Sequence, residues 1–520
     1  MLIGDIPALA AHSVPDLMAI GFRDRTLSYR ALRDQSWRLS NALLGIAAQG
    51  DRIAILAENC PEYVLCYYGV PGAGMALTLL NYRLAGPELI YIIGNAEPTV
   101  LIVEAKYLPA IEAIRADIPS VRHIFVIGES EGYESFDALV ARGDAERPCV
   151  AIGEDDPAWL LYTSGTTGLP KGAMLSHRNL IAGVMNAVAS WDRVLPSGQP
   201  SVFMLTFPMF HIAGWNVVVQ HVRRAELVIQ QNFDPESWFR TIEQFGVNET
   251  AAAPTMIAML LDHPARARFD LSSLKQIAYG AAAMPAALLL RVREIWPDVR
   301  FLTGFGMTEL SGNVTMLSPA EHVRGADENS PILNSVGREM LLVRVRVVDE
   351  TGRDVAEGEE GEIIVKGDQV LSGYWRNPEA TAASFTDGWF HSGDIGRRDS
   401  EGYLYIVDRK KDMIVSGGEN VYPREVEEVL YQHGAIVEAA VIGAADPVWG
   451  EEVVAVLTGR GSERPSAFEI VEFCRARIAS YKKPRAVVYV DELPKNASGK
   501  ILKRELRDRL VAGDLRLERP

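Results

Sequence analysis

The sequence predicts an α/β fold, in which a large N-terminal domain with parallel sheets and a β-rich subdomain precedes a small α+β C-terminal domain. Three observations predict it. Short apolar runs alternate with amphipathic segments up to about Ala283, as strands and helices do around a parallel sheet. Between Val343 and Gly367, alternating residues and glycine-containing turns indicate antiparallel hairpins. After Asp412 the mixed pattern returns.

Each element follows from its local pattern. Apolar residues at helical spacing follow Ser28, whose hydroxyl suits a helix N-cap, so we expect a helix there. Apolar runs bounded by polar residues predict buried strands, and a segment that begins with proline and ends in glycines predicts a second helix. The expected helices are 27–46, 61–74 and 422–434, and the expected strands are 51–59, 99–105 and 158–162.

The chain of 520 residues is too long for one ordinary core, so at least two domains are expected. We place their boundary in the charged segment Asp408–Asp412. This gives an N-terminal domain of residues 1–410 and a C-terminal domain of residues 411–520.

Composition limits the kinds of binding partner and the compartment that we expect for the protein. Basic minus acidic residues gives 52 − 68 = −16, so bulk attraction to nucleic acid or to anionic lipid is not expected. The four cysteines have neither disulfide nor metal spacing and fit free thiols in a reducing compartment. The N-terminus lacks the basic start of a signal peptide, and no apolar run is long enough for a membrane span. We expect a cytoplasmic protein, and the sequence leaves peripheral membrane contact and homodimer formation open.

The segment YTSGTTGLPKG, from Tyr162 to Gly172, has the composition of a phosphate-binding loop. Glycines let backbone N–H groups approach an anion, while hydroxyls add donors and a lysine adds positive charge. It is not the Gly-x-x-x-x-Gly-Lys-[Ser/Thr] loop, because Lys171 is followed by glycine. A flexible surface turn is the alternative interpretation. The candidate phosphate ligands are Thr163, Ser164, Gly165, Thr166, Thr167, Gly168 and Lys171.

Four further segments carry candidate ligands for a nucleotide. The ring of Phe305 could stack on a base, and the carboxylate of Glu309 could hold Mg²⁺. Asp394 lies between glycines, where it could pair with ribose hydroxyls, and Arg409 offers a second contact. Lys500 follows a serine and a glycine near the C-terminus. Taken singly, Asp394 could cap a turn, Glu309 could be a surface carboxylate, and Lys500 could be a solvated lysine.

Together these segments resemble the adenylate-forming superfamily, which includes acyl-CoA synthetases, firefly luciferase and peptide-synthetase adenylation domains. The resemblance covers nearly the whole chain and rests on YTSGTTGLPKG, PMFHIAGW, GFGMTE, GWFHSGD, YIVDRKKDMIVSGGENVYP and LPKNASGKILKREL, in the family's order. It implies that a carboxylate attacks the α-phosphate of ATP to give an acyl-adenylate and pyrophosphate. A thiol, usually that of CoA, then takes the acyl group and releases AMP. It also implies Mg²⁺ as cofactor, with ATP and CoA as co-substrates.

The resemblance implies a role for each matched residue. The loop orders the β- and γ-phosphates, Glu309 and Thr163 hold Mg²⁺, and Lys500 contacts the carboxylate and the α-phosphate. Many relatives have tyrosine where this chain has Phe305, so we expect the ring to stack on adenine without a hydroxyl contact. The implied catalytic residues are Lys500, Glu309 and His211. The implied nucleotide-binding residues beyond the loop are Gly280, Ala281, Ala282, Phe305, Gly306, Met307, Thr308, Asp394 and Arg409.

In this family the C-terminal domain is mobile and swings after adenylation, which withdraws the lysine and presents another face for the thiol step. Lys411 matches the position of the hinge, inside the segment already chosen as the boundary. The residues expected to line the path of the CoA arm are Ser416, Gly417, Gly418 and Glu419.

The segment PMFHIAGW is expected to face the acyl group, with Phe210, His211, Trp215 and Gly280 lining the pocket. It holds no aspartate, and an unpaired ammonium in an apolar pocket would be costly, so amino acids are disfavoured. Trp215 resembles a tryptophan that gates the fatty-acid tunnel of long-chain acyl-CoA synthetases, the alternative being a core tryptophan. We therefore expect a fatty acid, with an aryl or arylpropenoic acid as the second candidate.

A non-catalytic nucleotide-binding protein is the alternative from another functional class. Such a protein would typically have lost the lysine or the glutamate, and this chain has both Lys500 and Glu309. No carrier-protein attachment motif of the Gly-Gly-x-Ser kind follows Lys500. We therefore expect a stand-alone carboxylate–CoA ligase that uses free CoA.

Overall fold

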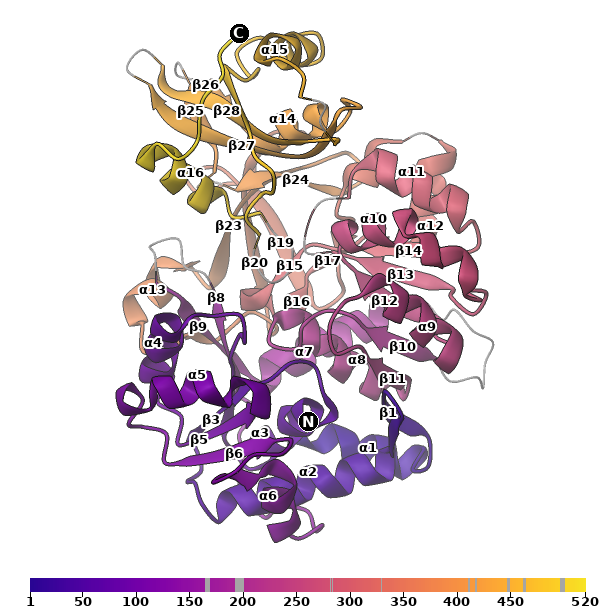
Figure 1. Cartoon of the computed structure of the whole chain (residues 1–520), viewed down its shortest axis with the longest axis vertical. Helices are drawn as coiled ribbons and strands as arrows, with labels where there is room; N and C mark the ends of the chain where they lie inside the picture. Colours follow the sequence, from indigo (N-terminus) through magenta and orange to yellow (C-terminus); the bar gives the residue numbers. More distant parts are fainter. Residues whose placement is uncertain are drawn as a thin grey trace.

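Three large sheets and two two-stranded sheets build the large N-terminal part of the computed structural model, and one further sheet builds the C-terminal part (Figure 1). The structure describes residues 1–163, 169–191, 201–280, 282, 284–328, 330–409, 412–416, 419–446, 449–461, 464–495 and 501–520. Among these residues, none of the helices has both the length and the apolar character that crossing a bilayer requires.

The first sheet has eight strands, and its middle strands are parallel. Strand β3 is buried at four of its five residues, as expected for a parallel strand with helices on both faces. In spatial order the strands are β21 (Gly373–Tyr374), β9 (Lys171–Ser176), β8 (Pro157–Thr163), β4 (Ala76–Leu79), β3 (Arg52–Leu56), β5 (Val100–Glu104), β6 (His123–Ile127) and β7 (Glu134–Ser135).

The second sheet has seven strands and is parallel except at the edge strand β2. Its strands β10 to β14 are parallel to one another, so the segments that follow them all leave the sheet at the carboxyl ends of the strands. In spatial order the strands are β14 (Arg300–Thr303), β13 (Gln276–Tyr279), β12 (Glu249–Ala252), β10 (Val202–Leu205), β11 (Glu226–Ile229), β1 (Met18–Phe22) and β2 (Arg25–Ser28).

Helices fill the space between these two sheets and cover their outer faces. The largest apolar core joins the inner faces of both sheets through α1 (Ile6–Ser13), α2 (Tyr29–Leu44), α3 (Pro61–Gly72), α7 (His177–Ser190) and α8 (Trp215–Arg223). Separate cores lie under α4 (Gly86–Ala96) and α5 (Leu108–Ala113) on the first sheet, and under α9 (Pro235–Phe245), α10 (Pro254–Asp262) and α11 (Ala286–Ile295) on the second. The remaining helices of this part are α6 (Phe136–Arg142), α12 (Pro319–Asp327) and α13 (Pro378–Ala383).

The third sheet is antiparallel, which confirms the β-rich subdomain expected from Val343 onward. It consists of β19 (Val343–Val348), β20 (Gly361–Gly367), β22 (Phe385–Thr386), β23 (Trp389–Arg398) and β24 (Leu404–Arg409). Two small hairpin-like pairs precede it, namely β15 (Gly306–Met307) with β16 (Gly312–Asn313) and β17 (Thr315–Met316) with β18 (Arg338–Glu339).

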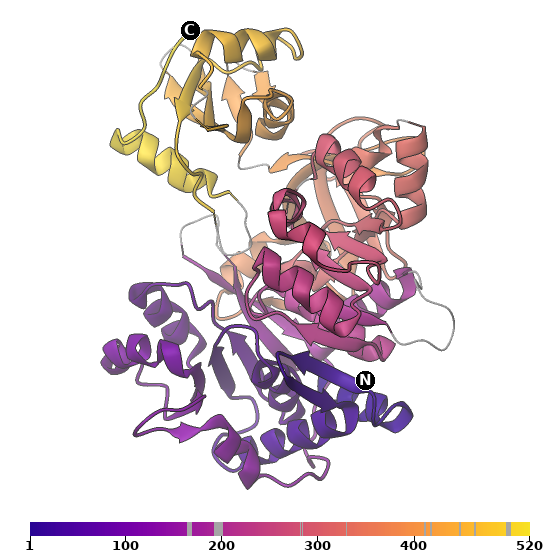
Figure 2. The same cartoon turned by 45° about the vertical axis from the view of Figure 1, so that its right-hand side comes forward.

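The C-terminal elements gather at one end of the molecule in both views (Figures 1 and 2). Their sheet has its own apolar cores and contains β25 (Ile414–Ser416), β26 (Glu419–Val421), β27 (Ile436–Asp446), β28 (Gly450–Gly459) and β29 (Ala486–Tyr489). The helices are α14 (Pro423–Leu430), α15 (Ala467–Arg475) and α16 (Lys503–Ala512). Residues 410 and 411, where we predicted the domain boundary, lie outside the described residues.

The expected elements are present. Ser28 caps α2, because its side chain accepts a hydrogen bond from the Ala31 backbone N–H. The expected strands 51–59, 99–105 and 158–162 correspond to β3, β5 and β8. The expected helices 61–74 and 422–434 correspond to α3 and α14, which ends earlier than the pattern indicated. The mixed α/β fold is therefore confirmed.

Candidate functional site

The phosphate-loop segment joins two paired strands. Strands β8 and β9 are antiparallel and place Thr163 opposite Lys171, so the two ends of the loop lie side by side. Hydrogen bonds link these strands to residues distant in the sequence. The Trp375 backbone N–H donates to the Gly172 carbonyl at 2.7 Å, and the Tyr162 hydroxyl donates to Asn95 at 2.6 Å. The other predicted ligands, Ser164, Gly165, Thr166, Thr167 and Gly168, lie outside the described residues.

Glu309 is a buried carboxylate beside this hairpin. It lies in the short 3-10 turn Thr308–Leu310 and is 6% exposed. The Thr163 hydroxyl donates to its Oε1 atom at 3.1 Å, and the Tyr374 hydroxyl donates to the same atom at 3.2 Å. Both hydroxyls therefore donate to the same oxygen, Oε1. The structure thus brings together Thr163, Lys171 and Glu309.

Tyr374 is a site residue that the sequence analysis missed. It ends strand β21, which pairs with β9 at the edge of the first sheet. Its ring lies 5.2 Å from the Lys171 ammonium, in the range of a cation–π contact. Burial, and then Glu309, raise the pKa of Tyr374, so its hydroxyl stays protonated and donates. One aromatic side chain therefore touches both the predicted cation and the predicted carboxylate.

The Glu309 site provides oxygen ligands. Within the described ranges, no group of three or more His, Cys, Asp or Glu side chains could hold a metal ion. Mg²⁺ is commonly bound in enzymes by one or two carboxylates together with substrate phosphates, rather than by a cage of protein ligands. A buried carboxylate next to a hydroxyl and a phosphate-loop hairpin fits that manner of binding.

The predicted base-binding segment follows strand β14 at the carboxyl edge of the second sheet. Phe305 is 9% exposed, and its backbone N–H donates to the Thr315 hydroxyl at 3.0 Å. The next two residues form β15, where a side chain on Gly306 would come 2.2 Å from the Gly312 carbonyl. This close pairing fixes the backbone of Gly306 and Met307, which connects Phe305 to the turn that contains Thr308 and Glu309.

Gly280 leaves the same edge one strand away, directly after β13. Ala282 is exposed, whereas Ala281 lies outside the described residues. The segments that follow β10, β13 and β14 hold the predicted acyl and base contacts. In open α/β sheets, ligands bind at the carboxyl ends of the strands, so this edge is where a substrate is expected.

Asp394 belongs to the third sheet. It is 3% exposed and lies directly across from Arg409 in the paired strands β23 and β24. Its backbone N–H donates to the Ser392 hydroxyl at 3.1 Å, and the preceding Gly393 has a φ of +69° that favours glycine. The two residues predicted to hold ribose therefore lie opposite each other on adjacent strands.

The predicted acyl wall runs from Phe210 to Trp215. The ring centroids of Phe210 and His211 are 4.3 Å apart, and burial, with a smaller effect of Arg83, lowers the pKa of His211 to about 4. Trp215 begins α8, is 6% exposed, and lies against Gly312, where a Cβ atom would come 2.8 Å from the indole ring. His211 is thus neutral at physiological pH, and the indole closes one end of the wall.

The predicted C-terminal residues are only partly described. Ser416 ends β25 and pairs with Glu419 in β26 and with Gly450 in β28. Lys495 and Ile501 pair on either side of the segment that carries the predicted lysine. The remaining predicted residues, Lys411, Gly417, Gly418 and Lys500, lie outside the described residues.

A serine-nucleophile pattern is present but in the wrong context. Residues Gly128 to Gly132 read Gly-x-Ser-x-Gly, with Ser130 at the centre. A nucleophile elbow requires a strand, a sharp turn and a helix. This segment instead joins two adjacent strands, β6 and β7, of the first sheet. It therefore gives no support to a serine hydrolase.

Comparison with known proteins agrees with the geometry. The model of the AMP-binding enzyme family matches residues 8–375, and that of the AMP-binding enzyme C-terminal domain matches residues 425–500. The chain is 36% identical to a feruloyl-CoA synthase from Amycolatopsis, covering 98% of this chain and 99% of the relative. It is 35% identical to the long-chain-fatty-acid–CoA ligase FadD13 of Mycobacterium tuberculosis, covering 97% and 96%. The crystal structure of the anthranilate CoA ligase AuaEII with anthranoyl-AMP is similar, with a TM-score of 0.88, 29% identity and coverage of 99% and 98%.

Proposed function

Because the chain belongs to the AMP-binding, adenylate-forming superfamily and is an AMP-forming acid–CoA ligase, we propose that its acid is a fatty acid. The observation that carries this choice is the wall from Phe210 to Trp215, which presents buried apolar rings and no acidic side chain. An alkyl chain gains about 0.8 kcal/mol for each CH₂ group buried on such a wall. An aryl or arylpropenoic acid is the second candidate, favoured by the ring contact of Phe210 with His211.

We assign the first half-reaction to the hairpin β8–β9 and its neighbours. A carboxylate attacking a phosphate brings two anions together, so the site must supply positive charge and fix the geometry. In the proposal, the backbone and hydroxyls of residues 163–168 and the ammonium of Lys171 hold the β- and γ-phosphates. Phe305 lies against adenine, Asp394 and Arg409 hold ribose, and Lys500 meets the carboxylate and the α-phosphate.

Mg²⁺, when bound, would neutralise phosphate charge. Glu309 and Thr163 would hold it, and their contact at 3.1 Å supports this assignment. Tyr374 and Thr163 both donate to Oε1 of Glu309, which orients the carboxylate. In the proposal, Oε2 is the oxygen that binds Mg²⁺. Burial of Glu309 keeps water from competing for the same oxygens.

Tyr374→Phe should weaken nucleotide binding in a magnesium-dependent way. The change removes the hydroxyl that donates to Glu309 and keeps the ring beside Lys171. A hydrogen bond to a charged group contributes about 1.5–3 kcal/mol, so we expect MgATP affinity to fall about 10-fold or more. Calorimetric titration with ATP, with and without magnesium, measures this.

The matched control for that experiment is Tyr29→Phe, which removes another buried hydroxyl whose bond at 2.6 Å goes to the Ala225 carbonyl. Its MgATP affinity should equal that of the wild type. An equal loss of ATP affinity for Tyr374→Phe in the absence of magnesium would contradict the role of the hydroxyl in orienting Glu309.

A panel of acids from acetate to palmitate, together with cinnamates, tests the proposed substrate. With ATP, CoA and each acid, AMP formation should rise about 4-fold in kcat/KM for each added CH₂, which corresponds to about 0.8 kcal/mol, until the chain reaches the indole of Trp215. Trp215→Ala should move the optimum to longer chains, and Trp389→Ala, on the third sheet, should not. Higher kcat/KM for cinnamates than for every alkyl acid would replace the fatty acid by the second candidate.

A further inference from the structure

Helix α12 lies outside the residues assigned to substrates, yet it contacts two of the segments that hold the proposed nucleotide site. The helix starts in a fixed position, because Ser318 caps it and the preceding Leu317 pairs with Thr303 at the end of β14. Two consecutive residues near its start, Glu321 and His322, reach different neighbours. Both are mostly buried polar side chains, and each has a tyrosine partner far away in the sequence.

His322 holds the end of strand β13. Its Nδ1 lies 2.9 Å from the Ser318 carbonyl, which can only accept, so Nδ1 carries the proton. Nε2 is then an acceptor, and the Tyr279 hydroxyl donates to it at 2.8 Å. Burial lowers the pKa of His322 to about 4, so this arrangement holds at physiological pH. The Tyr279 carbonyl accepts from the Thr303 hydroxyl at 2.8 Å, which fixes the residue at a second point.

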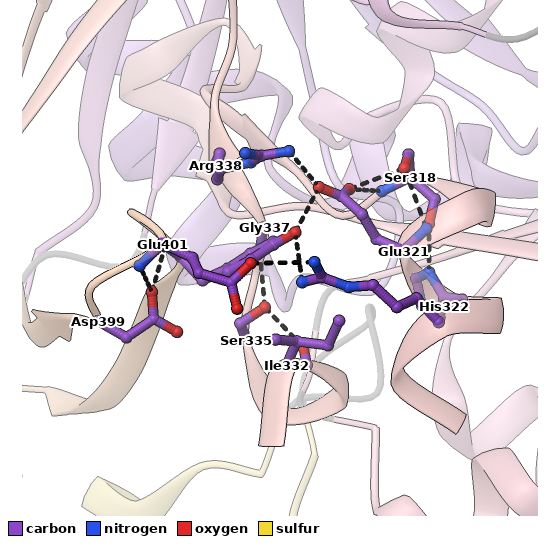
Figure 3. A network of polar contacts seen from close by, with 11 residues as sticks. Ser318, Glu321, His322, Ile332, Ser335, Gly337, Arg338, Asp399 and Glu401 are labelled. Carbon is purple, nitrogen blue, oxygen red and sulfur yellow. Dashed lines mark hydrogen bonds and ion pairs between the residues drawn. The ribbon is translucent and has the colours of Figure 1, made fainter. Parts of the chain in front are cut away.

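Glu321 holds the start of strand β24. Its carboxylate accepts from Ser318 and Arg338, which lie on either side of it in Figure 3, and from the Tyr403 hydroxyl at 2.9 Å. The Tyr403 ring is 1% exposed and lies between Arg324 and Arg338, at 5.5 and 4.9 Å. Burial raises the pKa of Glu321, but these hydrogen bonds outweigh it and lower the pKa overall, so the carboxylate is charged.

Both contacts end on segments that carry proposed ligands. Tyr279 is followed directly by Gly280, at the base and acyl wall. Tyr403 directly precedes β24, whose other end carries Arg409, across from Asp394 in β23. The Leu404 backbone is further fixed by bonds of 2.8 Å to Val336 and Gly337. One short helix thus bonds to the second sheet through His322 and to the third sheet through Glu321.

We propose that α12 is a brace that sets the position of the ribose-binding strands relative to the base-binding wall. Tyr279 and His322 are positioning residues for the base side, and Glu321 and Tyr403 are positioning residues for the ribose side. The inference rests on the proposed nucleotide site. It predicts that Tyr279 and His322 affect recognition of the base, and that Glu321 and Tyr403 affect recognition of the ribose.

Calorimetric titration with AMP, 2′,3′-dideoxy-AMP and GMP separates the effect on ribose recognition from the effect on base recognition. The wild type should prefer AMP over both analogues. Tyr403→Phe should lower the preference for AMP over dideoxy-AMP about 5-fold, as expected from one hydrogen bond, and leave the preference over GMP unchanged. Tyr279→Phe should lower the preference for AMP over GMP about 5-fold and leave the preference over dideoxy-AMP unchanged. Glu321→Gln, which keeps an acceptor for Tyr403, should resemble the wild type, whereas Glu321→Ala should resemble Tyr403→Phe.

Tyr29→Phe is the control for a purely structural effect. It also removes one buried tyrosine hydroxyl bond from the N-terminal part, so its melting temperature should fall as in the other variants while both preferences stay at the wild-type value. The brace is refuted if Tyr403→Phe and Tyr279→Phe change neither preference, or change both equally. A wild type that binds AMP no better than GMP and dideoxy-AMP would instead refute the proposed nucleotide site itself.

Discussion

Lys500→Ala should remove formation of the acyl-adenylate and spare formation of the thioester from supplied acyl-adenylate. In the proposed reaction the ammonium group lies between two repelling anions only in the first step. Loss of one preorganised charge of this kind typically costs about 10²–10³-fold in rate. ATP–pyrophosphate exchange measures the first half-reaction, and CoA thioester formation from synthetic acyl-adenylate measures the second.

The same pair of assays contains its own test of folding, because a variant that makes the thioester at the wild-type rate is folded. Lys495→Ala is the matched control. It removes a lysine from the same stretch of chain, where the side chain is paired with Glu438, and a partly exposed ion pair contributes about 1 kcal/mol or less. Both half-reactions should stay near wild type in this control. An equal loss of both steps in Lys500→Ala would contradict the separate role of the lysine.

Glu309→Gln should slow adenylation by about 10²–10³-fold, the usual cost of removing one preorganised electrostatic group. Glutamine keeps the shape and an oxygen acceptor for Thr163 and Tyr374 but loses the negative charge that would hold Mg²⁺. The magnesium concentration for half-maximal ATP–pyrophosphate exchange should rise, and thioester formation from supplied acyl-adenylate should change little.

Glu62→Gln is the control for loss of a buried carboxylate. Glu62 is 7% exposed and pairs with Arg25 at 2.9 Å, away from the proposed site. Its magnesium dependence should match that of the wild type even if its melting temperature falls. An unchanged magnesium dependence in Glu309→Gln would remove Glu309 from the proposed metal site.

The sequence predicted features that depend on neighbouring residues. Alternating patterns and caps such as Ser28 predicted the elements, and the glycine-rich motif predicted that Thr163 and Lys171 belong to one loop. It did not predict contacts that arise when separate sheets meet. Tyr374 is 65 residues from Glu309, and Tyr403 is 82 residues from Glu321. No local spacing encodes such pairs, because their geometry depends on how the first, second and third sheets pack together.

The proposed phosphate loop joins strands of the first sheet, whereas the proposed acyl wall follows a strand of the second. This separation has a consequence for how acid preference can change. Residues 210–215 take no part in the backbone pairing of β8, β9 and β21. New acid preferences could therefore accumulate by substitutions in one module while the nucleotide chemistry is inherited intact. Grafting residues 210–215 from a ligase for a different acid should therefore transfer selectivity when residue 215 still packs against Gly312.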